Sequence, residues 1–305
     1  MTAYIVRRVL WLIPVLLVVS AITFTLMHMA PGGPWAREKR LPASAVAALN
    51  RAYNLDKPVW EQYGIYIWNA SHGDLGPSMK YIGRNVTDIL AQGFPVTAHL
   101  GFMALGVALI LGLPLGVAAA IRQNSMIDYA SMFFAIIGVC TPSFILGILL
   151  MVLLASTLHV VPTAGWVTPQ HWILPTLTLA AYPAAQIARY TRASMLEVIR
   201  QDYVRTARAK GLAEQVVITA HMIKNALIPV VTVLGPITAF LVTGSFIIEY
   251  LFAVPGIGRL YVQAIGQRDY SMIMGTTLVY ALAVAVMNLI VDVLYVFIDP
   301  RIRLK

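Results

Sequence analysis

The chain has 305 residues, of which 59% are hydrophobic and only 11% are Asp, Glu, Lys or Arg, whereas soluble domains contain roughly 25% charged residues. This shortage of charge excludes a soluble globular protein. Five stretches carry no charged residue, and each is longer than the roughly 18 residues that indicate a membrane span: 9–36, 89–121, 129–188, 225–248 and 270–291. The composition predicts a polytopic helical membrane protein. The net charge of +9 is compatible with a nucleic-acid or anionic-lipid partner until the basic residues are located.

The third stretch is too long for one helix, because its 60 residues would extend about 90 Å, three times the hydrocarbon thickness. Turn-forming residues between His159 and His171 predict that the chain folds back there. The first stretch exceeds a signal-peptide core and is not followed by a cleavage site, so we expect it to be retained. The sequence therefore predicts an all-α protein with six transmembrane helices, near 9–29, 95–121, 129–156, 172–195, 226–248 and 271–296.

The distribution of basic residues predicts the orientation of these helices. The two tails and the loops after the second and fourth helices carry thirteen basic and five acidic residues, whereas the opposite side carries nine basic and seven acidic residues. We therefore expect both termini in the cytoplasm. The positive charge orients the helices and is no sign of a nucleic-acid partner.

An insertion of about 65 residues separates the first two helices, and we expect it outside the cytoplasm. It contains helix-like stretches near Pro42 to Tyr53 and Pro58 to Ala70, each opened by proline. The second is rich in aromatic residues (Trp60, Tyr63, Tyr66 and Trp68), which fits either a helix at the membrane interface or a docking surface for an external partner. The predicted division is 1–93 for the first helix and insertion, 94–299 for a five-helix membrane domain, and 300–305 for a cytoplasmic tail.

The sequence lacks the motifs of common enzymes. None of the six lysines follows a glycine, so there is no Walker A site. The six histidines are scattered, and His159 and His171 are expected to be solvated loop residues. Cys140 lies inside an apolar run, where we expect a small packing residue. We therefore expect no catalytic residue, cofactor or metal site in this chain.

Polar residues inside the predicted spans are few. Asp292 lies one turn after Asn288, so both share a helix face, which we expect to pack inside the bundle or line the permeation path. Glu249, at the outer end of the fifth helix, either shapes an outer gate, meets an external partner or is a solvated helix-end carboxylate. So few intramembrane charges argue against an ion- or proton-coupled carrier. Gly112 and Gly116 predict a close-packing face on the second helix.

The cytoplasmic loop 196–225 is patterned as two short helices. Asp202 is placed to cap the first helix, and Gly211 is placed to end it in a left-handed conformation. Tyr203, Val204 and Ala207 are expected to share one apolar face. Such a helix fits a cleft in another protein, or it rests on anionic lipid.

This loop resembles the coupling loop of binding-protein-dependent ABC importer permeases. The common form of that loop reads Glu-Ala-Ala, three residues, Gly, and then a stretch ending in Ile-x-Leu-Pro. Aligned on Gly211, this chain has Arg205 and Thr206 in place of Glu-Ala and keeps Ala207, while Pro229 lies farther from the glycine. These departures resemble the peptide-permease branch.

Other stretches resemble the B-type subunit of oligopeptide and dipeptide permeases over essentially the whole chain. They are Arg7-Arg8, Met29-Ala30-Pro31-Gly32, Gly73 to Ser78, Phe94 to Thr97, Pro255 to Gly258, Val291 to Tyr295 and Asp299-Pro300-Arg301. Within the family, the string from Gly76 to Tyr81 is more similar to the oligopeptide member than to the dipeptide, nickel or glutathione members.

The resemblance implies a type I ABC importer permease of a bacterial inner membrane. Its expected partners are a second six-helix permease subunit, two cytoplasmic ATPases that bind ATP and Mg²⁺, an external peptide-binding protein and membrane lipid. The residues implied in ATPase coupling are Asp202, Tyr203, Arg205, Thr206, Ala207, Ala209, Lys210 and Gly211. Replacing Ala207 with Glu is then expected to abolish uptake. The alternatives from other classes are a self-sufficient secondary transporter or channel, and a membrane scaffold without transport.

Overall fold

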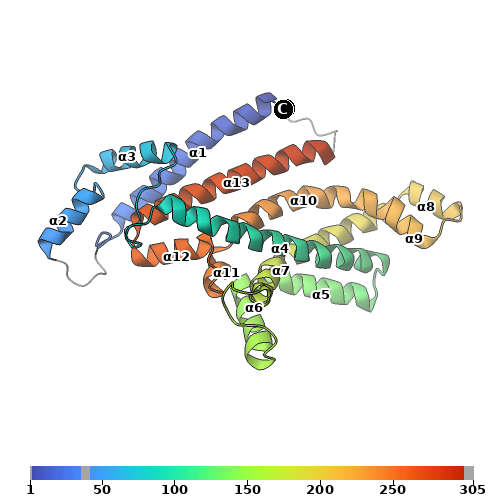
Figure 1. Cartoon of the computed structure of the whole chain (residues 1–305). Coiled ribbons are helices and arrows are strands. Elements are labelled where there is room, and N and C mark those ends of the chain that lie inside the picture. Colours follow the sequence, from blue (N-terminus) through green and yellow to red (C-terminus); the bar gives the residue numbers. More distant parts are fainter. Residues whose placement is uncertain (1, 36–41, 299–305) are drawn as a thin grey trace. The chain divides into compact units, whose positions relative to one another are not determined.

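A computed structural model describes residues 2–35 and 42–298, and these residues are mostly helical and form no β-sheet (Figure 1). They form two compact units. The first comprises the chain up to residue 97 together with 255–286, and the second comprises 98–254 together with the residues after 286. The first therefore includes a segment far along the chain, whereas the division at 93/94 and 299/300 expected from sequence is linear. That division stays a prediction, and its tail, 300–305, lies outside the described residues.

The first unit contains the amino-terminal helix, the two short helices of the insertion and two segments from the carboxyl-terminal part of the chain. Its helices are α1 (Thr2–Met29), α2 (Ala43–Ala52), α3 (Val59–Ser71) and α12 (Ile257–Gln267), with the first parts of α4 (Val86–Ile121) and α13 (Tyr270–Ile298). Helices α2 and α3 begin directly after Pro42 and Pro58, which confirms the two short helices predicted there, whereas the extracytoplasmic insertion stays a prediction.

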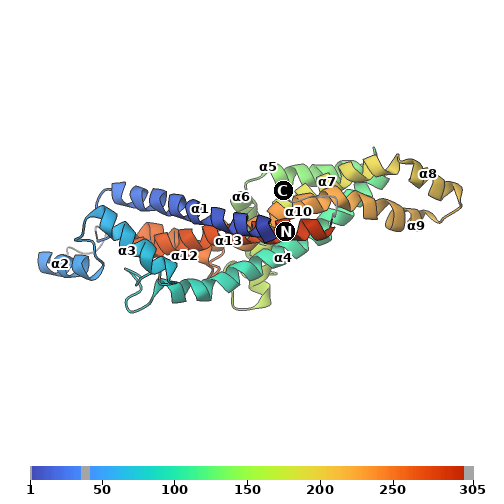
Figure 2. The same ribbon diagram turned by 90° about the horizontal axis from the view of Figure 1, so that it is seen from above.

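Helix α3 lies along α1 (Figure 2). The hydroxyl of Tyr63 donates a hydrogen bond to the carbonyl of Leu17 at 3.0 Å and lies 2.9 Å from the Ser20 hydroxyl. Tyr66 packs with Tyr63 against the core of the unit, whereas Trp60 and Trp68 are exposed. The aromatic residues of α3 thus divide into an inner tyrosine face and an outer tryptophan face.

Asp269 joins the insertion to the start of α13 within the first unit. Its carboxylate accepts hydrogen bonds from the Ser78 hydroxyl and from the backbone N–H groups of Met79 at 3.2 Å and Met272 at 3.0 Å. Asp269 is buried. Because a buried carboxylate requires several donors, these bonds fix the 78–81 turn to the helix.

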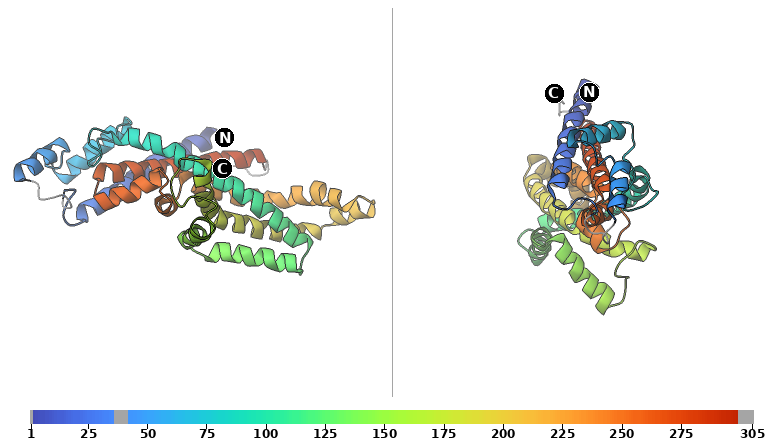
Figure 3. Two further views of the ribbon diagram at one scale, coloured as in Figure 1. Left: turned by 60° about the horizontal axis from the view of Figure 1, so that its bottom comes forward. Right: turned by 90° about the vertical axis from the view of Figure 1, so that its left-hand side faces the viewer.

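The second unit contains the remaining helices, including two π-helical turns. They are α5 (Met126–Cys140), α6 (Ser143–Leu150), η1 (Met151–Thr157), α7 (Pro169–Ile199), α8 (Asp202–Ala209), α9 (Glu214–Val216), η2 (Val217–Ile223), α10 (Lys224–Thr243) and α11 (Phe246–Leu251), with the later parts of α4 and α13. Helix α7 is central, because it contacts α5, α6, α10 and α11 (Figure 3).

Three glycines allow α4 to approach its neighbours closely. A Cβ at Gly112 would lie 2.7 Å from the Ala184 carbonyl oxygen of α7, and one at Gly116 would lie 2.5 Å from that of Ala188. At Gly101 a Cβ would lie 2.2 Å from a carbonyl oxygen of α10. Since real Cβ atoms do not approach so closely, the close-packing face predicted from Gly112 and Gly116 is confirmed.

The predicted span 129–156 is wrong as a continuous helix. Helices α5 and α6 meet at an angle of 111° across Thr141 and Pro142 (Figure 1). Pro142 lacks an N–H group and disfavours a helical conformation in the preceding residue, and Thr141 is accordingly extended, with ψ of 122°. The charge-free run therefore contains a break that its composition does not reveal.

Four helical segments of the described chain are long and apolar enough to cross a membrane, or five if the bent pair is one span. They include α1, α4, the segment from α9 to α11, and α13. The fourth predicted helix is present as α7, but it is not among these segments, because its sequence contains proline, threonine, glutamine and arginine. Six transmembrane helices therefore stay a prediction.

Candidate functional site

The short helix α8 lies beyond the ends of α7 and α10 (Figure 1). It ends before Gly211, whose φ of +75° is the left-handed conformation expected there. The expected cap is wrong, because Asp202 is the first helical residue and no side chain caps the helix. The Asp202 carboxylate instead lies 3.7 Å from the Arg205 guanidinium, at the exposed surface.

One face of α8 is buried in the chain's own core. Val204 is 0% exposed and Ala207 is 5% exposed. They belong to one apolar cluster that includes residues from the ends of α4 and α7, from η2 and from the start of α10: Ala120, Met195, Val217, Met222 and Ala226. Helix α8 is therefore packed against the ends of α4, α7 and α10.

The opposite face of α8 is exposed, and it presents Asp202, Tyr203, Arg205, Thr206, Ala209, Lys210 and Gly211. The predicted shared face is corrected, since Tyr203 does not lie with Val204 and Ala207. The expectation that Ala207→Glu tests ATPase coupling is wrong too. A glutamate at 207 would place a carboxylate in the apolar cluster, so its effect on uptake would report misfolding.

An ion pair between Arg208 and Glu214 joins α8 to α9 across the turn at Gly211. The guanidinium of Arg208 donates two hydrogen bonds to the carboxylate of Glu214, at 3.1 Å and 2.6 Å. Hydrogen bonding to this carboxylate raises the pKa of Arg208 above its ordinary value. After α9 the chain continues into the π-helical turn η2 and then into α10. A π-helical turn, of a kind that occurs often at functional sites, thus lies between α8 and α10.

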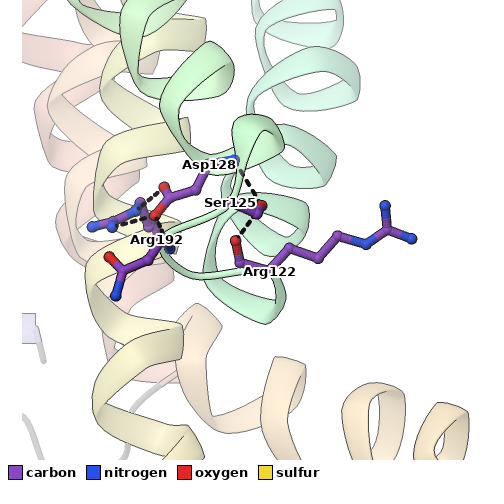
Figure 4. A network of polar contacts seen from close by, with 5 residues as sticks. Arg122, Ser125, Asp128 and Arg192 are labelled. Atoms are coloured by element: carbon purple, nitrogen blue, oxygen red, sulfur yellow. Dashed lines mark hydrogen bonds and ion pairs between the residues drawn. The ribbon is translucent and has the colours of Figure 1, made fainter.

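A partly buried ion pair between Asp128 and Arg192 joins α5 to α7 (Figure 4). Arg192 of α7 donates from Nε to Asp128 Oδ1 at 2.6 Å and from Nη2 to Oδ2 at 2.8 Å. The backbone N–H of Asn124 also donates to Asp128, and Ser125 caps α5. Asp128 is only 2% exposed. Asp128 and Arg192 were not selected from the sequence. Their opposite charges lie at the ends of two spans that end on the same side of the membrane, and this pattern could have suggested an ion pair.

The three candidates for the pathway or for helix packing lie in different surroundings. Glu249 of α11 is 0% exposed, so the solvated-carboxylate interpretation is wrong and the residue presents no surface to an external partner. Asn288 and Asp292 lie on α13 four residues apart, which confirms their common face, and both are half-buried. The carboxyl-terminal string Asp299-Pro300-Arg301 lies outside the described residues.

Cys140 is exposed at the end of α5, so its expected role as a packing residue is wrong. His159 is exposed, and His171 forms a capping box with Thr168 at the start of α7. No group of three or more His, Cys, Asp or Glu side chains suited to a metal occurs in the part of the chain that the structure describes.

Known proteins resemble this chain in sequence and in fold. Residues 112–304 match the family described as binding-protein-dependent transport system inner membrane component, and residues 1–101 match the family described as its N-terminal part. The chain is 45% identical to the Bacillus subtilis dipeptide transport system permease protein DppB, over 100% of this chain and 99% of that protein. It is 42% identical to the Escherichia coli K12 oligopeptide transport system permease protein OppB, over 99% and 100%.

A solved structure shares the fold at low sequence identity. The inward-facing MetNI methionine ABC transporter contains a chain that matches with a TM-score of 0.57 and 21% identity, covering 69% of this chain and 96% of that one. An amino acid ABC transporter structure matches with a TM-score of 0.54. The chain is thus an inner-membrane permease component and not an enzyme, and it belongs to the family of binding-protein-dependent transport system inner membrane components.

Proposed function

We propose that this chain is one of two membrane-spanning subunits of an ATP-driven peptide importer. The observation that carries the proposal is the identity of 42–45%, over nearly the full length, to permeases named for oligopeptide and dipeptide transport. A second six-helix permease, two cytoplasmic ATPases and an external peptide-binding protein complete the importer. ATP and Mg²⁺ bind to the ATPases, and this chain binds no cofactor.

In this proposal both termini and α8 face the cytoplasm. The excess of thirteen basic over five acidic residues on that side supports the orientation. The exposed face of α8, including Tyr203, Thr206 and Ala209, then meets an ATPase cleft, whereas anionic lipid is the competing occupant. Zero-length crosslinking of the complex through Lys210 would separate the two, because only the ATPase contact gives a protein adduct.

The packing of α8 supports a mechanical role. Val204 and Ala207 fill the apolar cluster between the ends of α4, α7 and α10, so a force on α8 is passed to those helices. Since Arg192 of α7 holds Asp128 of α5, the same motion reaches the bent pair α5 and α6. Switching between inward- and outward-facing states requires that the ATPases hold α8 differently in each state.

Oligopeptides are the proposed substrates, with dipeptides, glutathione and nickel as alternatives. The string from Gly76 to Tyr81 that favours oligopeptides also has a structural role, because Ser78 and Met79 are buried and bind Asp269. Competition between tri-alanine and di-alanine for uptake would decide between the two peptide classes.

Reconstitution tests the proposal directly. Liposomes containing the chain with its co-purified partners should accumulate radiolabelled tri-alanine only when ATP and the binding protein are supplied. Liposomes containing the chain alone should accumulate none. Accumulation by the chain alone, driven by an ion gradient, would favour the secondary carrier. The absence of accumulation by any combination would favour the scaffold.

A further inference from the structure

The break between α5 and α6 creates a requirement for water or polar groups. Backbone that leaves a helix at membrane depth is tolerated only where protein buries it or where it lines a water-filled cavity. A cavity of about 580 Å³ lies at this break, lined by Thr141 and Ser143 at the bend, Tyr182 and Pro183 of α7, and Phe240 and Ser245 on and after α10. The cavity has room for many water molecules, and its lining is mixed: hydroxyl groups at the bend and on Tyr182 and Ser245 lie beside apolar side chains such as Val139 and Leu179.

A row of polar side chains continues from the cavity along α7. The amide of Gln186 donates to the Tyr182 hydroxyl at 2.8 Å, and the Arg189 guanidinium donates to the Gln186 carbonyl at 2.8 Å. Because the helix rises 1.5 Å per residue, the row extends about 10 Å from Tyr182 to Arg189. Tyr182 is 45% exposed, although α7 is otherwise among the most buried helices of its unit.

The neighbouring helices expose side chains of a different kind. Most exposed positions of α5 and α6 are apolar, for example Phe133 and Ile136 on α5 and Ile148 on α6, as contact with hydrocarbon requires. The charge distribution places Arg189 toward the cytoplasmic end of α7, whereas Gln186 and Tyr182 lie about one and two turns deeper along the helix. Because polar groups in contact with hydrocarbon are costly, we expect this row of α7 to face water or another polar surface.

Arg189 also differs from Arg192, which lies one turn further along α7. Arg192 is neutralised by Asp128, whereas no ion pair to Arg189 occurs in the described part of the chain, and its hydrogen bond goes to neutral Gln186. An exposed cation without an acidic partner attracts an anionic group. A free peptide carries one at its carboxyl terminus, and its amide groups match the hydroxyl and amide of Tyr182 and Gln186.

We propose that the cavity at the α5–α6 bend and the Tyr182–Gln186–Arg189 row form this chain's wall of a water-filled peptide path, with Arg189 facing the carboxylate of the passing peptide. The proposal rests on the peptide-import function above and specifies which surface of the chain the substrate crosses. Contact would be brief and independent of peptide side chains, as a route for varied peptides requires.

Thiol labelling of the assembled transporter tests the path. In a Cys140→Ala background, cysteine is placed at 182 or 186, and at 133 or 148 as matched exposed controls. A charged methanethiosulfonate reagent, which reacts with thiols in water, should label positions 182 and 186 at least tenfold faster than the controls. Labelling there should stop tri-alanine uptake while ATP hydrolysis continues, and saturating tri-alanine should slow the labelling. The unaltered chain should be labelled at Cys140, which lines the cavity.

Labelling of 182 and 186 at the control rate, or labelling without effect on uptake, would overturn the proposal while peptide import stands. If the unaltered transporter, with Cys140 in place, imports no peptide, the proposed function itself fails and the path fails with it; the uptake of the Cys140→Ala background is measured against that of the unaltered transporter. Arg189 has a separate test. Arg189→Glu should slow tri-alanine uptake at least fivefold with ATP hydrolysis retained, and Arg189→Lys should restore most of it. Uptake by Arg189→Glu at the parent rate would contradict the role of the cation.

Discussion

Adding a single methyl group at Gly116 of α4 tests the packing of α4 against α7. The new Cβ would lie 2.5 Å from the Ala188 carbonyl oxygen and 2.6 Å from the Thr191 Cβ, both rigidly held on α7. Ordinary contacts begin at 3.4 Å, so the helices would have to separate by close to 1 Å. Overpacking of this kind costs about 1–3 kcal/mol, and the helix preference of alanine over glycine returns about 0.5–1 kcal/mol. Gly116→Ala should therefore destabilise the protein by up to about 2.5 kcal/mol.

The same helix supplies a matched control for this substitution. No atom lies within 4 Å of a Cβ at Gly106, so Gly106→Ala should keep the gain in helix preference and stabilise the protein by about 0.5–1 kcal/mol. Thermal and detergent-induced unfolding of the purified variants would measure both changes. Equal stability of the two variants would refute the close approach of α4 and α7 at this point.

The remaining predictions concern buried polar and apolar groups. Asp128→Ala should destabilise the protein by about 1.5–3 kcal/mol because it removes the charged acceptor of two hydrogen bonds from the partly buried Arg192, and a double-mutant cycle with Arg192→Ala should show coupling between the two residues. Asp269→Ala should remove the carboxylate that accepts hydrogen bonds from Ser78, Met79 and Met272, so the 78–81 turn should become sensitive to limited proteolysis. Unchanged cleavage would contradict the role of Asp269 in holding this turn. Ala207→Glu should reduce the amount of folded protein in size-exclusion chromatography, and normal folding would contradict its burial.

The long helices and the loop organisation were predictable from the sequence. Charge-free runs located α1, α4 and α13, because lipid contact excludes charged side chains along a whole helix face. Gly211 marked the end of α8, because the left-handed conformation there favours glycine. Gly112 and Gly116 marked a close helix contact for an equally local reason, the absence of a side chain.

The features that the sequence did not reveal depend on tertiary contacts. Hydropathy and charge do not detect a break at Pro142, so the bend between α5 and α6 was not predicted from the sequence. A proline inside a long apolar run could have indicated it. The buried face of α8 is determined by the apolar residues that pack against it from other helices. Alanine is common on both buried and exposed helix faces, so Ala207 did not mark the buried face in the sequence. From the sequence, Glu249 is expected at the surface because carboxylates are usually exposed, yet the fold buries it completely.

The central claim is that ATP hydrolysis drives the chain through the exposed face of α8. Ala209→Glu places a carboxylate on that face without entering the apolar cluster, since Ala209 is exposed whereas Ala207 is buried. The decisive measurement is the number of tri-alanine molecules imported per ATP hydrolysed by the reconstituted complex. We expect Ala209→Glu to fold normally and to lower this ratio at least tenfold. An unchanged ratio, with the variant fully assembled, would contradict coupling through α8.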